Sequence, residues 1–249
     1  MCPPRPPSAS RSRFGFNPVV DVGDDKRALA ASGLLDVFKK LWPDSWGPRL
    51  EYILRNRYTV EESDAIMGPL IGRPKTGIFR LQDLVGLDVS YGVGANLYGL
   101  IPDDETREVL RDPHLNSLRQ TQIDRGRLGD KTGQGFYRKP RNGAKESILT
   151  LDLETLEYRP RREPEIPSIN EALKINSLSE RLAFVLVQDD RAGALARHVV
   201  YNALAYAARR VPEITDQIVN LDRAVRWGYS HELGPFEIWD ALGVRQTVK

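Results

Sequence analysis

Cysteine and histidine are scarce in this sequence of 249 residues, which contains one cysteine and three histidines. Because Cys2 is the only cysteine, the chain can form no internal disulfide and no site with several thiolate ligands. A single thiol fits a reducing compartment, and we expect a cytoplasmic protein. The histidines stand at no spacing typical of metal ligands, so we expect no metal site (His114, His198, His231).

The sequence also lacks a strong excess of charge and any long apolar run. A formal net charge of +2 is too small to favour binding to nucleic acid or to a membrane surface. Apolar stretches such as residues 182–187 are far shorter than the ~20 residues of a membrane helix, and no signal peptide is evident. With 41% hydrophobic and 28% charged residues, the composition is typical of globular proteins with one large domain or two small ones.

The N-terminal residues 1–25 are predicted to form a disordered tail. Residues 1–18 hold five prolines and three arginines but no acidic residue. Such a segment cannot bury enough apolar surface to offset the entropy lost on ordering, and its paired prolines exclude an amphipathic targeting helix. A second irregular segment, Arg159–Pro167, is charged and rich in proline, and we interpret it as a linker.

Helical patterns dominate the chain before this linker. Residues 26–40 and 46–57 have apolar residues at helical spacing, and residues 79–85 form another short helical segment. Thr59-Val-Glu-Glu62 reads as a capping box, in which the threonine hydroxyl accepts from the glutamate amide and the glutamate carboxylate reaches back. We therefore expect a helix to begin at this threonine.

Helices are again predicted after the linker. Asp190 is placed to cap a long helix that runs from residue 191 to about Arg210, with apolar residues every three or four positions. Thr215 is expected to cap a further helix over residues 216–227, and residues 233–242 should form the last one.

Two stretches between these helices are not helical. Residues 126–137 contain four glycines within ten positions, and each would cost about 1 kcal/mol in a helix. They predict a shaped loop that leads into an extended Phe-Tyr pair. Residues 148–153 and 156–158 flank a turn at residues 152–155, which predicts a β-hairpin.

An internal repeat relates the two halves. Residues 79–87 read Phe-Arg-Leu-Gln-Asp-Leu-Val-Gly-Leu, and residues 236–244 read Phe-Glu-Ile-Trp-Asp-Ala-Leu-Gly-Val. An aspartate, Asp64 or Asp222, precedes each copy at nearly the same distance, with one extra residue in the first copy. We interpret the match as a duplicated helical unit.

The repeated positions suggest mostly structural roles. Phe79 and Phe236 are expected to lie in related places in the core, and the glycine near the end of each copy should end its helix in the left-handed conformation. Asp83 and Asp240 could act as acids in catalysis, but the capping of a neighbouring helix is the role that the pattern favours.

Three segments resemble one protein family. Residues 64–87, the glycine-rich residues 126–137, and residues 227–240 are similar to the C-terminal helical domains of bacterial 3-hydroxyacyl-CoA dehydrogenases. The last of these resembles the second copy found in multifunctional fatty-acid oxidation proteins. The resemblance covers about Tyr58 to Val244. It implies a mainly α fold, a duplicated dehydrogenase C-terminal domain with a small β-hairpin between the copies.

The family's catalytic features have no counterpart here. No Gly-x-Gly-x-x-Gly follows a strand, and the loose match at residues 92–99 lies in a stretch with a helical pattern. Residues 14–18 read Phe-Gly-Phe-Asn-Pro, with phenylalanine where the family motif has its catalytic histidine. We therefore assign no catalytic, cofactor-binding or metal-binding residue to this chain, although the family uses NAD.

Other polar residues do not replace the missing groups. The family places an Asn-Arg pair beside the substrate, but Asn56-Arg57 lies too late in the sequence for that role. Asn202 occupies the comparable helix of the second copy, where a hydrogen bond between helices is the favoured interpretation. The histidines are expected in an exposed polar segment, on a helix face, and in the second repeat's loop beside a glutamate (His114, His198, His231).

These observations predict four segments: a tail (1–25), a first dehydrogenase-like helical repeat (26–140), a hairpin and linker (141–168), and a second helical repeat (169–249). One hypothesis is that the chain is the substrate-side part of a dehydrogenase that converts 3-hydroxyacyl-CoA and NAD to 3-oxoacyl-CoA and NADH in fatty-acid β-oxidation, inactive alone. A separate NAD-binding chain or self-association would complete it. The alternative is a non-catalytic helical remnant, or a module that binds acyl-CoA or protein. The abrupt edges of the resemblance predict a fragment of a longer ancestral protein.

Overall fold

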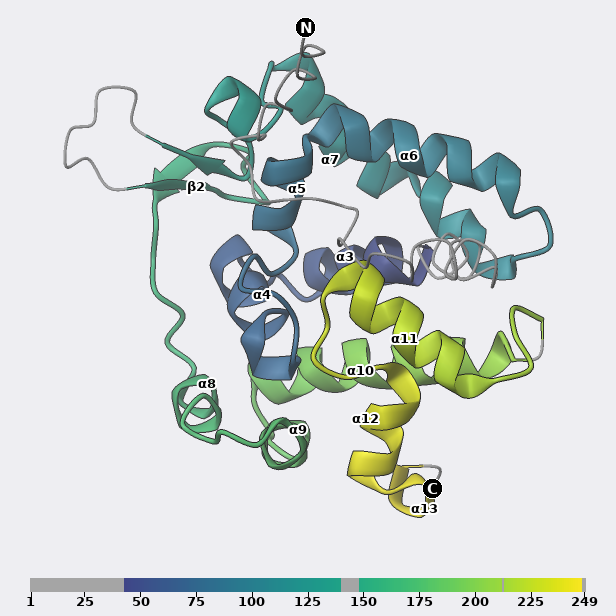
Figure 1. Ribbon diagram of the computed structural model, residues 1–249. Helices are drawn as coiled ribbons and strands as arrows, with labels where there is room; N and C mark the ends of the chain where they lie inside the picture. Colours follow the sequence, from purple (N-terminus) through teal and green to yellow (C-terminus); the bar gives the residue numbers. More distant parts are fainter. Residues whose placement is uncertain (1–42, 140–147, 212, 248–249) are drawn as a thin grey trace, which may run out of the picture.

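The computed structural model describes residues 43–139, 148–211 and 213–247, and these are almost entirely helical (Figure 1). The predicted tail, the predicted helix at 26–40 and the Phe-Gly-Phe-Asn-Pro segment lie outside the described residues. The first half contains α3 (Pro43–Arg55), α4 (Val60–Ile66), the 3-10 helix η1 (Pro69–Ile71), α5 (Phe79–Val85), α6 (Leu87–Leu100), η2 (Glu105–Arg111), α7 (Pro113–Asp124) and η3 (Asp130–Thr132). The second half contains α8 (Pro167–Ala172), α9 (Leu178–Leu186), α10 (Arg191–Arg209), α11 (Ile218–Tyr229), α12 (Pro235–Leu242) and α13 (Val244–Thr247).

A small antiparallel sheet lies between the two halves in the sequence. Its strands are β1 (Tyr137–Arg138), β2 (Leu149–Leu151) and β3 (Tyr158–Pro160), in the order β1-β2-β3. The predicted hairpin is confirmed, because the Asp152 carboxylate accepts from the backbone N–H groups of Glu154 and Thr155 at 3.0 Å and holds the turn. Its second strand begins later than expected, since Leu156 has a φ of 58° and cannot continue a strand.

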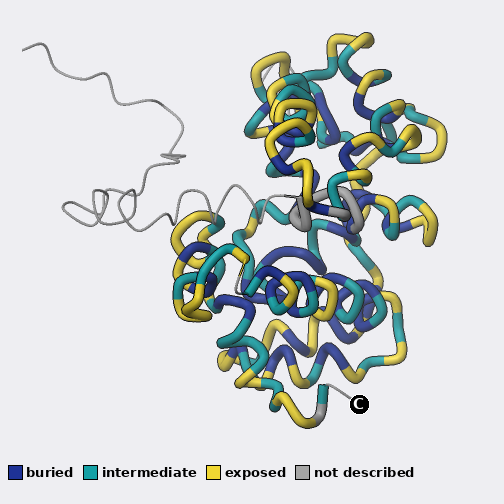
Figure 2. The backbone as a smooth tube through the Cα atoms, turned by 90° about the vertical axis from the view of Figure 1, so that its right-hand side faces the viewer, coloured by how far each residue is buried: buried dark blue, intermediate teal, exposed yellow. Residues whose placement is uncertain are grey.

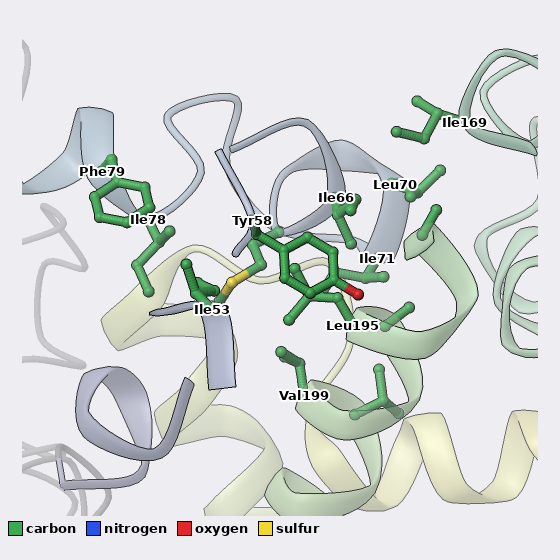
Figure 3. Close-up of a cluster of buried hydrophobic side chains, with 14 of the residues drawn as sticks. Ile53, Tyr58, Ile66, Leu70, Ile71, Ile78, Phe79, Ile169, Leu195 and Val199 are labelled. Carbon is green, nitrogen blue, oxygen red and sulfur yellow. The ribbon is translucent and has the colours of Figure 1, made fainter. Parts of the chain in front are cut away.

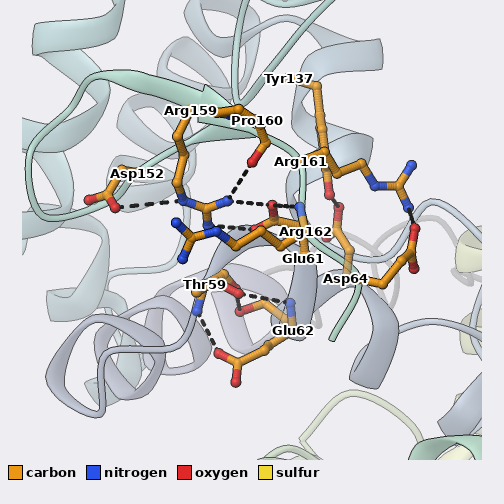
Figure 4. A network of polar contacts seen from close by, with 12 residues as sticks. Thr59, Glu61, Glu62, Asp64, Tyr137, Asp152, Arg159, Pro160, Arg161 and Arg162 are labelled. Carbon is orange, nitrogen blue, oxygen red and sulfur yellow. Dashed lines mark hydrogen bonds and ion pairs between the residues drawn. The ribbon is translucent and has the colours of Figure 1, made fainter. Parts of the chain in front are cut away.

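The predicted linker at Arg159–Pro167 is wrong at its first residues. Arg159 and Pro160 belong to β3, where they pair with Thr150 and Leu149 of β2. The Arg159 guanidinium also donates two hydrogen bonds to Glu61 on α4, at 2.7 and 2.8 Å (Figure 4). Because Glu61 lies far earlier in the sequence, local composition gave no sign of this attachment.

Two of the three predicted helix caps are confirmed. Thr59 and Glu62 form the capping box at the start of α4, and Asp190 accepts from the Gly193 N–H at the start of α10. Thr215 does not cap α11. Its hydroxyl accepts from the Gln217 N–H instead, which forms a turn before the helix, so α11 begins at Ile218 and continues through Gly228 to Tyr229.

One main hydrophobic core joins the two halves. Its buried members run from Leu50 on α3 to Leu204 on α10, and Figure 3 shows residues of both halves meeting there. The long helix α10 has contacts with α3 and α4 of the first half and with α8, α9 and α12 of the second. Buried positions therefore alternate with exposed ones along most helices of both halves (Figure 2).

The two repeated phenylalanines differ in burial, which corrects the expectation that both lie in the core. Phe79 is fully buried and its ring centroid lies 4.6 Å from that of Phe136. Phe236 is only partly buried, against a smaller cluster around Tyr206 and Leu221. The difference arises because the glycine-rich loop covers α5, whereas among the described residues no such loop covers α12.

Candidate functional site

The first aspartate of the repeat fixes the start of a helix. On α4, the Asp64 carboxylate accepts hydrogen bonds from three successive backbone N–H groups at the start of α5, 2.7–3.0 Å away (Ile78, Phe79, Arg80). The Tyr137 hydroxyl donates to the same carboxylate at 2.8 Å. Burial raises the pKa of Asp64 to about 6, against the effect of these hydrogen bonds. This group binds backbone and is not open to a ligand.

The aspartate that leads the second copy has the same arrangement. Asp222 on α11 accepts from the Phe236 N–H at 2.8 Å at the start of α12, and burial raises its pKa to about 6. In each copy a glycine two residues before the phenylalanine touches the aspartate. A Cβ on Gly77 would lie 2.6 Å from the Asp64 Cα, and one on Gly234 would overlap Asp222. The sequence alignment of the copies therefore corresponds to equivalent contacts in space.

Asp83 holds the glycine-rich loop against α5. Its two carboxylate oxygens accept from the backbone N–H groups of Phe136 and Tyr137, each at 2.8 Å, so the expectation that it caps a helix is wrong. A Cβ on Gly129 or Gly135 would overlap Asp83, which explains why the loop has glycine there. Burial raises the pKa of Asp83 to about 7. Its counterpart Asp240 is exposed and caps no helix in the described structure.

Arg80 and Asp130 add a further clamp beside this loop. The Arg80 guanidinium donates two hydrogen bonds to the Asp130 carboxylate, both at 2.6 Å, and this pairing lowers the pKa of Asp130. Such a two-point contact fixes both orientation and distance. The glycine-rich loop is thus part of the scaffold.

An open cleft with a volume of about 490 Å³ lies between α3, α7 and the β2–β3 turn. Its lining combines leucines, among them Leu54, Leu118 and Leu156, with charged and polar groups (Arg57, Thr59, His114, Ser117, Asp152, Glu154, Arg159). Several of these charges are already matched: Arg57 lies 3.2 Å from Glu154, and Arg159 contacts Glu61 and Asp152. A cleft of this size can take part of a small organic ligand.

The three histidines lie in different surroundings. His114 is exposed at the cleft rim, as expected. His198 stacks on Tyr52, with ring centroids 3.9 Å apart, and contacts Asn202 one turn further along α10. Burial and the charges of two arginines hold the pKa of His231 well below its usual range.

The two asparagines are also in local contacts. Asn56 donates to the Tyr52 carbonyl at 2.8 Å within its own helical segment. Asn202 is exposed and its contact with His198 lies within α10, so the expected hydrogen bond between helices is wrong. Neither side chain projects into the cleft, whose lining contains neither residue.

The structure bears on three binding features: a dinucleotide-binding turn, a metal site and a membrane span. Residues 92–99 lie within helix α6, which confirms that this stretch is no phosphate-binding turn. Within the described ranges, no His, Cys, Asp and Glu side chains gather in a group able to hold a metal ion. None of the helices in the described part of the chain combines the length and apolar character that a membrane crossing needs.

Sequence reasoning missed two long-range polar contacts. Glu61 with Arg159 joins α4 to the sheet, and the Tyr206 hydroxyl donates to Asp104 at 2.6 Å, which joins α10 to η2. These partners are 98 and 102 residues apart. No spacing rule pairs residues at such separations. The sequence therefore held no signal for these contacts, which become evident only once the burial of the charged groups is known.

Comparison with known proteins gives one family match. Residues 50–139 match the family model described as "3-hydroxyacyl-CoA dehydrogenase, C-terminal domain". The chain is 38% identical over 200 residues to a probable 3-hydroxyacyl-CoA dehydrogenase of Bacillus subtilis, which covers 80% of this chain and 24% of the relative. It is 29% identical over 177 residues to a putative fatty acid oxidation complex trifunctional enzyme of Rickettsia felis, which covers 70% of this chain and 22% of the relative.

A shorter match is to a probable 3-hydroxyacyl-CoA dehydrogenase of Deinococcus radiodurans, 34% identical over 93 residues, or 37% of this chain and 25% of that protein. The chain thus spans about a quarter of the length of the curated relatives it matches. No solved structure matches the chain.

Proposed function

We propose that the chain, whose residues 50–139 match the C-terminal domain of 3-hydroxyacyl-CoA dehydrogenases, forms the substrate-side helical part of such an enzyme in fatty-acid oxidation. In the reaction implied by the family, a base takes the proton of the 3-hydroxyl group while hydride passes from the same carbon to NAD. The products are a 3-oxoacyl-CoA and NADH. In this proposal the base and the NAD site come from outside the described residues, through a separate NAD-binding chain or self-association.

The observation that carries this proposal is that the family's characteristic residues act as a scaffold. Asp64 and Asp83 accept only from backbone groups and Tyr137, and the glycine-rich loop is closed onto α5. Because these side chains are already satisfied, they can shape a wall but cannot transfer a proton to an open site. Of the described histidines, His198 stacks on Tyr52 and His231 lies beside Tyr229, with ring centroids 3.9 and 5.8 Å apart.

We place the acyl-CoA contact at the cleft of about 490 Å³ between α3, α7 and the β2–β3 turn. The leucines of its lining suit an acyl chain, and its charged groups suit the polar part of the ligand. Ser117 lines this cleft from the exposed face of α7, whereas Gln120 lies on the same helix, is exposed and does not line it. These two residues provide a matched pair for a test.

We also propose that the second half is a copy of the family domain. The equivalent contacts of Asp64 with Gly77 and Phe79, and of Asp222 with Gly234 and Phe236, support a duplication. The domain division proposed from the sequence, with repeats at 26–140 and 169–249 around a hairpin and linker, agrees with this interpretation.

The decisive experiment measures NADH formation and acyl-CoA binding separately. The purified chain with NAD and 3-hydroxyacyl-CoA should show no turnover, because the loss of a proton-transfer group alone typically lowers the rate by about 100-fold or more. Titration calorimetry should still detect acyl-CoA binding, which Ser117→Trp should weaken by obstructing the cleft and Gln120→Trp should leave unchanged. NAD-dependent turnover at the rate of full-length relatives would contradict the need for a completing chain.

A non-catalytic helical module is the second candidate. It is favoured by the same observation that the described polar residues of the family motifs are used internally. Absence of acyl-CoA binding, alone and with an added NAD-binding domain of a relative, would decide for this module and against the substrate wall.

A further inference from the structure

Two residues that line the cleft between α3, α7 and the β2–β3 turn have a backbone conformation that favours glycine. Among the described residues, seven glycines have a positive φ, and only three residues of other types do (Arg57, Leu156, Ser230). Arg57 and Leu156, with φ of 53° and 58°, both line this cleft, and Ser230 does not. A side chain in the left-handed region costs free energy that glycine avoids, so a reason is needed for the side chains at these two positions.

Arg57 follows α3 at the position where a helix end of this kind usually has glycine. Its N–H donates to the Leu54 carbonyl at 3.1 Å, and the Tyr58 N–H donates to the Ile53 carbonyl at 2.9 Å. The Arg191 guanidinium donates to the Arg57 carbonyl at 3.0 Å and fixes the conformation further. The Arg57 side chain is 82% exposed, so it adds little to the packing of the fold.

Leu156 is held in a similar way at the end of the β2–β3 turn. Its N–H donates to the Asp152 carbonyl at 2.9 Å. Its own carbonyl accepts from the guanidinium groups of Arg125 and Arg127, at 2.9 and 2.8 Å. The leucine side chain is half-buried against the main core and lines the cleft. Backbone strain that neighbouring groups hold in place in this manner clusters at ligand sites.

The two side chains offer opposite chemistries to a ligand. The Arg57 guanidinium lies 3.2 Å from the Glu154 carboxylate, which is itself 64% exposed. Solvent screens such a pair, so a phosphate that accepts two parallel hydrogen bonds from the guanidinium can take the place of Glu154. Leu156 offers apolar surface that a hydrocarbon chain would cover.

We propose that Arg57 and Leu156 determine the specificity of this cleft for an acyl-CoA thioester. Arg57 binds a phosphate of the CoA part, with loss of its contact with Glu154, and Leu156 contacts the acyl chain. This inference rests on the proposed function, which places the acyl-CoA contact in the same cleft. The backbone strain at both positions is then the cost of turning a cation and an apolar group towards one ligand that carries both an anion and a chain.

Calorimetric titration of the full chain with free CoA and with octanoyl-CoA tests the two residues separately. Arg57→Gly should weaken the binding of both ligands about tenfold, because it removes a charge-assisted hydrogen bond. It should not lower the Tm, because glycine adopts this backbone conformation without strain. Leu156→Asn keeps a residue type that tolerates the conformation, and it should weaken only octanoyl-CoA, about fivefold or more. If this variant does not fold, Leu156→Gly takes its place.

Ser230→Gly is the matched control, since Ser230 has a φ of 56°, is exposed and lies outside the cleft. It should raise the Tm and leave both affinities unchanged. This inference alone is overturned if octanoyl-CoA binds the unchanged chain, Ser117→Trp weakens that binding, and the variants at Arg57 and Leu156 bind both ligands like the unchanged chain. If the unchanged chain binds no acyl-CoA, the proposed function fails and this inference fails with it.

Discussion

Asp83 and Asp240 hold the same position in the repeat but lie in different surroundings, and this difference predicts a pH effect. Burial raises the pKa of Asp83 from 3.8 to about 7, so the folded state disfavours its ionised form relative to the unfolded state. Its contribution to stability is therefore complete below about pH 4 and is lost as the pH rises towards 7.

Asp83→Asn removes this titration. Relative to the variant, the free energy of unfolding of the unchanged chain should fall as pH rises from about 4 to about 7, because only the unchanged chain has the Asp83 carboxyl group to titrate. Urea unfolding at a series of pH values measures the difference. A constant offset between Asp83→Asn and the unchanged chain would show that Asp83 does not titrate in this range.

The two repeated phenylalanines give a second comparison at the scale of single residues. Phe79 is fully buried against Phe136, so Phe79→Ala should lower the free energy of unfolding by about 3–5 kcal/mol. Phe236→Ala should cost clearly less, because Phe236 is only partly buried. Denaturant unfolding of both variants checks the order, and equal losses would mean that the second copy packs as tightly as the first.

At the scale of elements, the attachment of the sheet to α4 depends on one buried ion pair. Glu61 is 4% exposed and accepts two hydrogen bonds from Arg159 and one from the Arg162 N–H at 3.0 Å. Glu61→Gln removes the carboxylate that accepts both Arg159 hydrogen bonds and leaves the guanidinium only the longer carboxylate contact with Asp152, at 3.7 Å. We expect a loss of about 3–5 kcal/mol in the free energy of unfolding and faster hydrogen exchange in β2 and β3.

The exposed pair of Arg57 with Glu154 is the matched control, since its side chains are 82% and 64% exposed. Glu154→Gln should change stability by about 0–1 kcal/mol, because solvent screens such a pair. If both glutamine variants behave alike, the buried pair does not hold the sheet.

At the scale of the whole molecule, the shared core predicts one unfolding transition. Helix α10 of the second half buries Leu195 and Val199 in the same cluster as Leu50 and Phe79 of the first half. Neither half can therefore keep its apolar surface covered alone. Circular dichroism and the exchange of amides in α4 and α10 should report coincident unfolding in urea. Separate transitions for the two helices would instead indicate two independent domains.

The sequence by itself determined the features that depend on near neighbours. The Thr59–Glu62 capping box, the Asp190 cap and the hairpin turn at Asp152 each arise from contacts within a few residues, and all are confirmed. The repeat was also visible, because equivalent contacts of Asp64 and Asp222 constrain the same residue types in each copy. The Thr215 cap was wrong, since a turn competed for the same hydroxyl.

Only the tertiary structure decided which charged groups meet and how deeply each copy is buried. Arg159 looks like part of a linker until Glu61, 98 residues earlier, is placed beside it. The sequence likewise gives no sign that the His231 loop meets the loop of Arg73, a contact formed by the Glu232 N–H and the Gly72 carbonyl. The physical reason is the same in both cases. Burial and electrostatic free energy depend on distance in space, and a sequence pattern encodes only distance along the chain.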